Sequence, residues 1–193
     1  RVRTIHEDAK GSLWIGTLGS GLNLYDVEKQ RFQHLQHDGA DFRSLNNDSV
    51  KVIYEDGEGN LWIGTFGGLN KYNVGQQLFQ HFVFNSSIPG SINDNSVRAI
   101  YQDSNQVLWV GTRSGLNRYN NNSGLFEYFT HDQSNPHSLS DNRVSSIYED
   151  STGSLWIGTY NGLNKYDASS KNFQHFFHNP SLHFIISTLK IQN

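Results

Sequence analysis

Apolar and polar residues alternate over short stretches of this chain, and polar stretches that contain glycine separate them. In VKVIYE at 50–55, the valines and the tyrosine fall on one side of an extended strand, and the lysine, isoleucine and glutamate fall on the other. No stretch keeps a helical apolar period between capping residues. The pattern predicts short β-strands joined by tight turns.

The chain repeats one unit four times. A tryptophan phrase marks each unit, with LWIGT at 13–17, 61–65 and 155–159 and LWVGT at 108–112. Three other phrases recur around it, with one extra residue after the tryptophan phrase of the first unit: an opening phrase ending in Asp at 2–8, 50–56, 97–103 and 144–150, a GLNxY phrase at 21–25, 68–72, 115–119 and 162–166, and an aromatic phrase at 31–38, 78–85, 125–132 and 172–179. This similarity within one chain sets the architecture.

Each unit predicts four short antiparallel strands. In the second unit they are expected near 49–55, 61–66, 68–73 and 78–83. Asp56 starts the first turn, where its carboxylate accepts backbone N–H groups, and Gly59 supplies a positive φ. The glycine of the tryptophan phrase leaves room for a neighbouring backbone or ring to approach closely.

Four strands in a repeat of about 40 to 50 residues are typical of a β-propeller, in which stacked blades bury both faces of each sheet. We therefore predict an all-β fold of four four-stranded antiparallel propeller blades, with Trp and Tyr filling the space between them. We expect Trp62, Trp109 and Trp156 to be mostly buried. The predicted blades cover residues 1–43, 44–90, 91–137 and 138–179.

Two stretches depart from the repeat. The third unit has Ser104, Asn105 and Gln106 where its siblings have a turn glycine, so we expect this turn to differ. Residues 180–193 lose the pattern and turn apolar. For this divergent tail three interpretations stay open: a degraded first strand of a fifth blade, a strand that covers an edge, and a foreign end.

The repeat also bears on closure of the ring. The chain lacks Met and opens within a repeat phrase, which indicates a fragment or a processed product of a longer protein. A truncated parent, a closed four-bladed ring and two arcs joined into an eight-bladed dimer all satisfy the pattern. The bulky Trp and Tyr residues favour an open arc of a seven- or eight-bladed propeller. Such an arc exposes apolar faces, so we expect self-association or packing with missing blades of a parent chain.

Composition excludes several classes of function. The 193 residues carry a net charge of −3, so no basic footprint of a nucleic-acid-binding protein is present. The longest apolar runs are far shorter than a membrane helix, and we expect no membrane insertion by this segment. The absence of Cys removes disulfides, thiolate metal sites and cysteine nucleophiles.

Residues that could hold a metal or carry catalysis do not converge. His34, His81 and His175 share one position on the fourth strand of three blades and diverge around the outside, so we expect no metal site. Adjacent Glu and Asp residues point apart along a strand and make poor acid–base couples. The aspartates are better explained as turn caps: Asp8, Asp56, Asp103 and Asp150. No nucleophile elbow or P-loop occurs, and we expect neither catalytic residues nor a cofactor.

The polar connectors between units carry the candidate ligand-binding residues. They read SLNNDSV at 44–50, SINDNSV at 91–97 and SLSDNRV at 138–144. If the first strand of each blade is innermost, the connectors end at the mouth of a central channel. Amides and carboxylates there suit sugar hydroxyls, and cations such as Arg3 suit an anionic group, although Asn and Asp are also common turn residues. The predicted ligand-binding residues are Asn46, Asn47, Asp48, Lys51, Asn93, Asp94, Asn95, Arg98, Asp141, Asn142 and Arg143.

The repeated phrase V-x-x-I-Y-E-D-x-x-G-x-L-W-I-G-T-x-G-G-L-N-x-Y resembles the two-component-regulator propeller repeat, over residues 1–179. The resemblance implies the periplasmic or other extracytoplasmic sensor region of bacterial hybrid histidine kinases and diguanylate cyclases. It also implies ligands such as carbohydrate breakdown products. None of the kinase, cyclase or membrane segments of such sensors lies in this chain.

These observations predict a ligand-sensing input module of a bacterial signal-transduction protein, with a carbohydrate or another small molecule as its ligand. One alternative is a non-catalytic scaffold that binds proteins through aromatic blade edges. A second alternative is a propeller lyase or glycosidase, which would need carboxylates or histidines clustered at the channel mouth.

Overall fold

The computed structural model describes residues 1–27 and 29–178. Within them sixteen β-strands form and no helix. The predicted divergent tail at 180–193 falls outside the described residues. The strands in chain order are β1 (Val2–Glu7), β2 (Leu13–Thr17), β3 (Leu22–Asp26), β4 (Arg31–Leu35), β5 (Val50–Glu55), β6 (Leu61–Thr65), β7 (Leu69–Asn73), β8 (Leu78–Phe82), β9 (Val97–Gln102), β10 (Leu108–Thr112), β11 (Leu116–Asn120), β12 (Leu125–Phe129), β13 (Val144–Glu149), β14 (Leu155–Thr159), β15 (Gly162–Asp167) and β16 (Asn172–Phe176).

The strands form four separate antiparallel sheets, and each sheet takes its four strands in chain order. Each sheet lies inside one predicted unit, and the strands of the second unit begin and end within one residue of their expected positions. The prediction of an all-β fold with four four-stranded propeller blades is confirmed.

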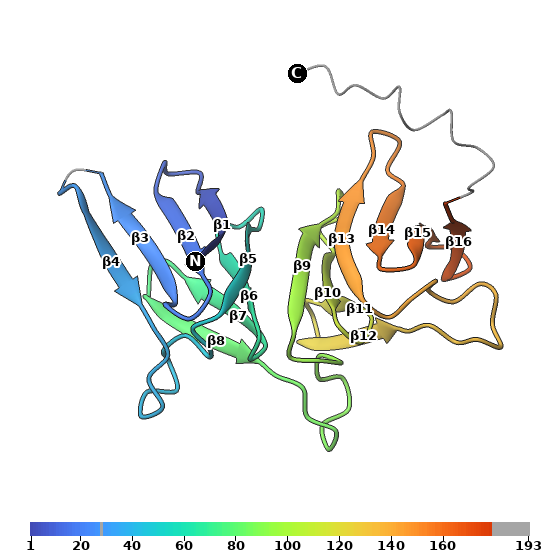
Figure 1. The fold of residues 1–193 in the computed structure, drawn as a ribbon, viewed down its shortest axis with the longest axis horizontal. Coiled ribbons are helices and arrows are strands. Elements are labelled where there is room, and N and C mark those ends of the chain that lie inside the picture. The colour runs from blue at the N-terminus through green and yellow to red at the C-terminus, as the bar shows by residue number, and fades with distance from the viewer. Residues whose placement is uncertain (28, 179–193) are drawn as a thin grey trace.

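The sheets fan out from a row of inner strands (Figure 1). β1 packs beside β5, β5 beside β9, and β9 beside β13. β4 and β16 lie at opposite ends of the molecule (Figure 1). The four blades therefore form an arc whose inner edge consists of the first strand of each blade.

A β-bulge interrupts every inner strand near its start. In β5, Val50 pairs with Thr65 and Val52 pairs with Gly64, which leaves Lys51 without a partner on β6. The same register shift leaves one unpaired residue in each of the other inner strands: Arg3, Arg98 and Ser145. Bulges of this kind bend a strand and re-aim its side chains.

The bulge corrects the alternation predicted for β5. The sequence pattern placed Val50 on the same side as Val52 and Tyr54. In the structure Val50 packs with Ile53 against the first blade, whereas Val52 and Tyr54 pack toward the third blade. One extra residue at the bulge moves the start of the strand to the other face, because side chains alternate with a period of two.

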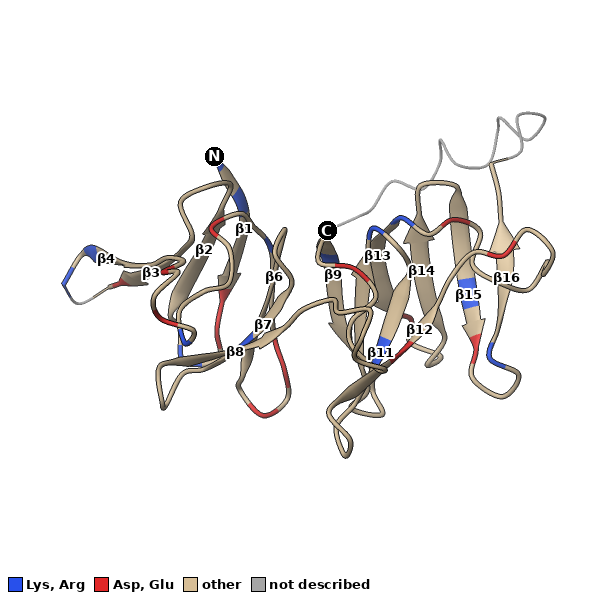
Figure 2. Ribbon diagram, turned by 90° about the horizontal axis from the view of Figure 1, so that it is seen from below, with Lys and Arg blue, Asp and Glu red and all other residues tan. Residues whose placement is uncertain are grey.

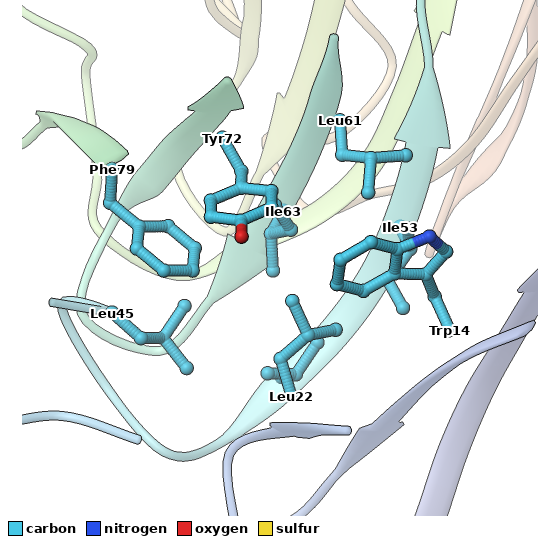
Figure 3. Close-up of a cluster of buried hydrophobic side chains, with 9 residues drawn as sticks. Trp14, Leu22, Leu45, Ile53, Leu61, Ile63, Tyr72 and Phe79 are labelled. Atoms are coloured by element: carbon cyan, nitrogen blue, oxygen red, sulfur yellow. The ribbon is translucent and has the colours of Figure 1, made fainter. Parts of the chain in front are cut away.

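The hydrophobic core lies between blades. One cluster joins Trp14 and Leu22 of the first blade, Leu45 of the connector and a set of second-blade residues (Figure 3): Val50, Ile53, Leu61, Ile63, Tyr72 and Phe79. The Trp14 ring meets the Tyr72 ring edge-on, with 5.6 Å between centroids. Leu45 is fully buried, so the connector fills the space between the two sheets.

The same packing recurs at the next two junctions. Trp62 meets Tyr119 at 5.5 Å and Trp109 meets Tyr166 at 5.1 Å, both edge-on. The connector residues Ile92 and Leu139 take the place of Leu45. Aromatic pairs in this geometry contribute about 0.5–1.5 kcal/mol beyond their area burial. The predicted role of Trp and Tyr between blades is therefore confirmed.

The glycine of the tryptophan phrase permits close contact between blades. A Cβ at Gly64 would lie 2.5 Å from Cγ1 of Val97 on the next inner strand. The equivalent pairs are Gly16 with Val50 and Gly111 with Val144. The close approach was predicted, but the neighbour is a valine side chain rather than a backbone or a ring.

The aspartate after each inner strand ties a turn to the tryptophan. Asp56 Oδ2 accepts a hydrogen bond from Trp62 Nε1 at 2.7 Å, and Asp56 Oδ1 accepts the backbone N–H groups of Glu58 and Asn60 at 3.0 and 2.9 Å. Asp8, Asp103 and Asp150 make the same bonds in their own blades. The turn-cap prediction is confirmed, and the tryptophan bond adds a partner that the pattern did not indicate.

The turn of the third blade does not differ from its siblings. Gln106 adopts φ of 63° where Gly59 has 78°, and its N–H bonds to the Asp103 carbonyl at 2.9 Å as that of Gly59 does to Asp56. A non-glycine residue takes this conformation at some strain. The Asp103 cap and the Trp109 bond hold it there.

A second set of hydrogen bonds links the turn of each blade to the next inner strand. Glu55 accepts the backbone N–H of Ala9 at 2.8 Å, 46 positions earlier in the chain. Gln102 and Glu149 repeat this contact on Gly57 and Ser104, at 2.8 and 2.7 Å. Each of these Glu or Gln side chains therefore points to the preceding blade, while the neighbouring Asp stays in its own turn, as predicted for adjacent strand residues.

The outward faces of the first and last blades are exposed. Ile5 of β1 is 64% exposed, whereas the equivalent Ile53 is 7% exposed. Leu163 of β15 is 40% exposed, whereas the equivalent Leu116 is fully buried. Burial of Trp62 and Trp109 is confirmed, but Trp156 is only partly buried because no further blade covers it among the described residues.

The tryptophan at an internal junction should matter more than the one on the exposed face. We expect Trp109→Ala to lower the free energy of unfolding by about 3–5 kcal/mol, because it opens a cavity between two blades. Trp156→Ala should cost about 1–2 kcal/mol, since its ring is already partly hydrated. Urea unfolding followed by fluorescence measures both, and equal losses would contradict packing between blades as the main source of stability.

The exposed faces should associate. We expect sedimentation to detect species heavier than the 21.9 kDa monomer, and an apolar dye to bind the monomer. Leu163→Asp should reduce both effects, because it places a charge on the fourth-blade face. A stable monomer that binds no dye would show that this prediction is wrong.

Candidate functional site

The candidate ligand-binding residues lie at one end of the arc, where the connectors meet the inner strands. We name this end the connector rim and define it by Arg3 and residues 46–51, 93–98 and 141–145 together with Phe66, Arg113 and Tyr160. At the rim the backbone N–H of Phe66 bonds to the carbonyl of Ser49 at 3.2 Å. The matching bonds are Arg113 to Ser96 at 3.2 Å and Tyr160 to Arg143 at 3.1 Å. These bonds set the residue after each tryptophan phrase beside the start of an inner strand.

Bulges in the inner strands supply basic residues of the rim. Figure 2 colours the Lys and Arg positions of the ribbon blue. Three of the four bulge residues are cations: Arg3, Lys51 and Arg98. The fourth blade has Ser145 at the bulge. Bulges are common beside functional sites because they re-aim a side chain without ending the strand.

The basic residues lie close enough to repel one another. Burial lowers the pKa of the Lys51 ammonium, and repulsion from Arg98 and Arg3 lowers this pKa further. Arg113 adds to the repulsion, whereas Asp94 opposes it. We name Arg3, Lys51, Arg98 and Arg113 the cationic cluster. None of the ion pairs found among residues 1–27 and 29–178 includes a member of it.

Two aromatic rings stand beside the cationic cluster. The Lys51 Nζ lies over the Phe66 ring, 3.8 Å from its centroid. The Arg98 guanidinium lies over the Tyr160 ring at 5.1 Å, and its Nη1 donates to the Tyr160 hydroxyl at 2.7 Å. Phe66 is 45% exposed and Tyr160 is 59% exposed, so both rings are open to a ligand.

Arg143 is neutralised by its own connector. Its Nε and Nη2 donate to the Asp141 carboxylate at 3.0 and 2.9 Å. These hydrogen bonds lower the pKa of Asp141 and raise that of Arg143, so both groups stay charged. Arg143 also lies over the Tyr160 ring at 4.8 Å, and it therefore positions this ring.

The first asparagine of each connector is bonded to its own blade. Asn46 Oδ1 accepts hydrogen bonds from Thr65 Oγ1 and Asn70 Nδ2, both at 2.8 Å, and Asn46 Nδ2 donates to the Gly67 carbonyl at 3.2 Å. Asn93 repeats these bonds in the third blade. Ser140 takes this place in the fourth blade. The hydrogen-bonding capacity of these amides is largely used inside the fold.

The remaining connector residues also accept backbone N–H groups. Asn47, Asp94 and Asp141 each bond to the N–H two residues ahead, at 2.9, 2.6 and 2.7 Å. The next residue in each connector bonds to the end of the preceding blade: Asp48 to His37, Asn95 to Phe84 and Asn142 to His131, at 2.7, 2.7 and 2.6 Å. The structure thus brings all eleven predicted residues to the connector rim, and the acidic and amide groups among them shape the connectors.

Sequence reasoning missed Phe66, Arg113 and Tyr160. A signal was available, because the residue after the constant Thr of the tryptophan phrase differs in every unit, whereas the GLN of the next phrase does not change: Leu18, Phe66, Arg113 and Tyr160. Variation at one position of an otherwise uniform repeat is typical of a surface that carries function.

Two of the three equivalent histidines on the outer strands form hydrogen bonds with connector carbonyl groups. His81 Nε2 bonds to the Ser44 carbonyl at 2.6 Å, and His175 Nε2 bonds to the Ser138 carbonyl at 2.5 Å. His34 bonds to Asn23 instead. No group of three His, Asp or Glu side chains suited to a metal ion occurs in the part of the chain that the structure describes.

Comparison with protein families identifies the repeat. The model of the two component regulator propeller matches residues 1–19, 44–67, 91–114 and 138–161, once in each blade. Each of the four blades therefore contains one repeat of the two component regulator propeller family. In every blade the match includes the inner strand and the tryptophan phrase, so it contains the bulge and the variable position of the rim.

Solved structures share the fold of this regulator propeller. Two extracellular domains described as parts of hybrid two component systems of B. thetaiotaomicron align with TM-scores of 0.78 and 0.74 at 24% and 23% identity. The alignments cover 92% of this chain but 24% and 25% of those chains, so the regulator propeller spans about a quarter of their length. A virginiamycin B lyase of Staphylococcus aureus aligns at 0.67 with 15% identity, covering 93% of this chain and 56% of that chain.

A search of the curated proteins gave no match to this regulator propeller. Among the described residues, no helix has the length and apolar character needed to cross a membrane.

The repulsion within the cationic cluster leads to a stability prediction. Arg113 is exposed and its side chain makes no hydrogen bond among the described residues, so Arg113→Gln should leave the urea midpoint unchanged or raise it slightly at low salt. This gain should vanish near about 1 M NaCl, where the screening length is about 3 Å. Arg143→Gln breaks an ion pair and should give no gain. A clear loss of stability in Arg113→Gln would show that the cluster is internally compensated.

Proposed function

We propose that this regulator propeller is the ligand-sensing input module of a bacterial signal-transduction sensor, placed outside the cytoplasm. The family supports the role in signalling. The fold shared with extracellular domains of hybrid two component systems supports the location. Ligand binding would shift an equilibrium between assembly states that the output part of the sensor reads.

The connector rim is the proposed binding surface. The observation that carries this proposal is the repeated bulge, which places a cation at the same point of three consecutive blades. Structural repeats need no uncompensated charge at that point, since Ser145 occupies it in the fourth blade. The exposed rings of Phe66 and Tyr160 stand next to these cations. Aromatic rings with a few directed polar groups are typical of ligand sites.

A carbohydrate is the proposed ligand class. Sugar rings present apolar faces that pack on aromatic side chains and hydroxyls that bond to charged donors. The connector rim has both kinds of group side by side: the aromatic rings of Phe66 and Tyr160, and the charged donors Lys51 and Arg98. The lyase alternative has support at the level of the fold alone, because the lyase structure is 15% identical. The scaffold alternative draws on the exposed blade faces, whose apolar residues include Ile5 and Leu163.

The test is a thermal-shift screen of the chain against neutral and acidic oligosaccharides. We expect at least one member to raise the unfolding temperature, and we expect Phe66→Ala to abolish the shift. Phe42→Ala is the matched control, because Phe42 is exposed and lines a separate groove on the outside of the second blade. A shift that Phe42→Ala abolishes instead would place the ligand in that groove. The absence of any shift would overturn the proposed function.

A further inference from the structure

The charged side chains at the connector rim indicate which class of carbohydrate would bind there. We infer that it binds an acidic oligosaccharide, one whose sugars carry carboxylate or sulfate groups, through the cationic cluster of Arg3, Lys51, Arg98 and Arg113. This inference rests on the proposed function, because it takes the connector rim as the ligand site.

The first step is that the amides of Asn46 and Asn93 have little hydrogen-bonding capacity left for a neutral sugar. Asn46 uses both sites of its oxygen on Thr65 and Asn70, and one N–H on Gly67. Asn93 does the same in the third blade. Recognition of neutral sugars relies on free directional donors and acceptors. In Asn46 and Asn93 these donors and acceptors form hydrogen bonds that stabilise the connectors.

The second step is that the cations lack anionic partners within the described residues. Lys51, Arg98, Arg3 and Arg113 form no ion pair within the described part of the chain. The Nε of Arg98 is buried and has no hydrogen-bond partner there. Clustered like charges and an unbonded buried N–H both cost stability. A bound anion would relieve both costs, because it brings the missing charge and an acceptor.

The third step is the distribution of the charges. Each of the first three blades contributes one cation from an equivalent bulge, so the charges recur at the spacing of the blades. A small inorganic anion can neutralise one or two of them. An oligosaccharide with a charge on successive sugars can reach several, and its rings can rest on Phe66 and Tyr160. Binding at several linked charges adds up to a higher affinity than one contact provides.

The test is calorimetric titration of the chain with a trimer of 1,4-linked galacturonate, with its full methyl ester and with a sulfated galactose trimer. The methyl ester keeps the sugar rings and removes the charge, so it isolates the anionic contribution. We expect the galacturonate or the sulfated trimer to bind and the ester to bind at least about tenfold more weakly. Affinity should fall between low salt and about 1 M NaCl, where charges are screened. Sodium sulfate alone should bind more weakly than either trimer.

Variants locate the site. Arg98→Gln and Lys51→Gln should each weaken binding of the acidic trimer by about ten- to a hundredfold. Arg98→Lys should lose part of that affinity, since it keeps the charge but lacks the planar fork of donors. Arg31→Gln is the matched control, because it removes one positive charge from the exposed outer strand β4. Urea midpoints of all variants establish that each one folds.

The outcomes separate the inference from the proposed function. Equal binding of the acid and its ester would overturn the inference and leave a neutral-sugar sensor. Weakening by Arg31→Gln equal to that by Arg98→Gln would show a general charge effect and overturn the assignment to the cluster. If only the sulfated trimer binds, the anionic class stands with sulfate as its source. If no trimer binds while the thermal-shift screen yields other ligands, the inference alone fails.

Discussion

The packing of each tryptophan against the next blade is the interaction on which the rest of the structure depends. Trp14, Trp62 and Trp109 each pack edge-on with a tyrosine of the following blade, and each donates its Nε1–H to the Asp of its own turn. A four-stranded sheet cannot bury both faces alone, so the junction between blades is where most apolar surface leaves water. The glycine two positions later keeps the neighbouring inner strand close enough for this contact.

The geometry of the connector rim follows from that constraint. The connector must bury Leu45, Ile92 or Leu139 between two sheets and then enter the next inner strand. Its Asn and Asp side chains hold this path by accepting backbone N–H groups, and the β-bulge absorbs the change of direction where the strand begins. A structural requirement of the repeat thus creates one unpaired residue per blade at the same end of the arc. The side chain at that position is not needed for strand pairing, so it is available for ligand binding in the proposed function.

The two ends of the inner strands differ in whether their polar and charged side chains have partners within the fold. At the turn end, Glu55, Gln102 and Glu149 are committed to N–H groups of the preceding blade, so their charges and dipoles are matched within the fold. At the connector rim, the cationic cluster is unmatched and Lys51 is held among like charges. Proteins accept local conflicts of this kind mainly at functional sites, where a ligand supplies the missing partner. The arrangement supports the proposed function, in which the turn end stabilises the blades and the connector rim binds the ligand.

The sequence by itself determined the repeat, the four strands of each blade, the turn caps and the burial of Trp62 and Trp109. These features depend on local alternation and on residues that recur at equal spacing, which one chain displays four times. Only the tertiary structure decided that Lys51 and its equivalents sit in bulges, that the variable residues Phe66 and Tyr160 lie beside them, and that Asn46 and Asn93 bond inward. A bulge changes the register by one residue and leaves no clear mark in the hydrophobic pattern. In the sequence, an Asn that stabilises a connector cannot be told from an Asn that binds a sugar. The partner of a polar side chain is fixed by contacts between distant residues, and these exist only once the blades have stacked.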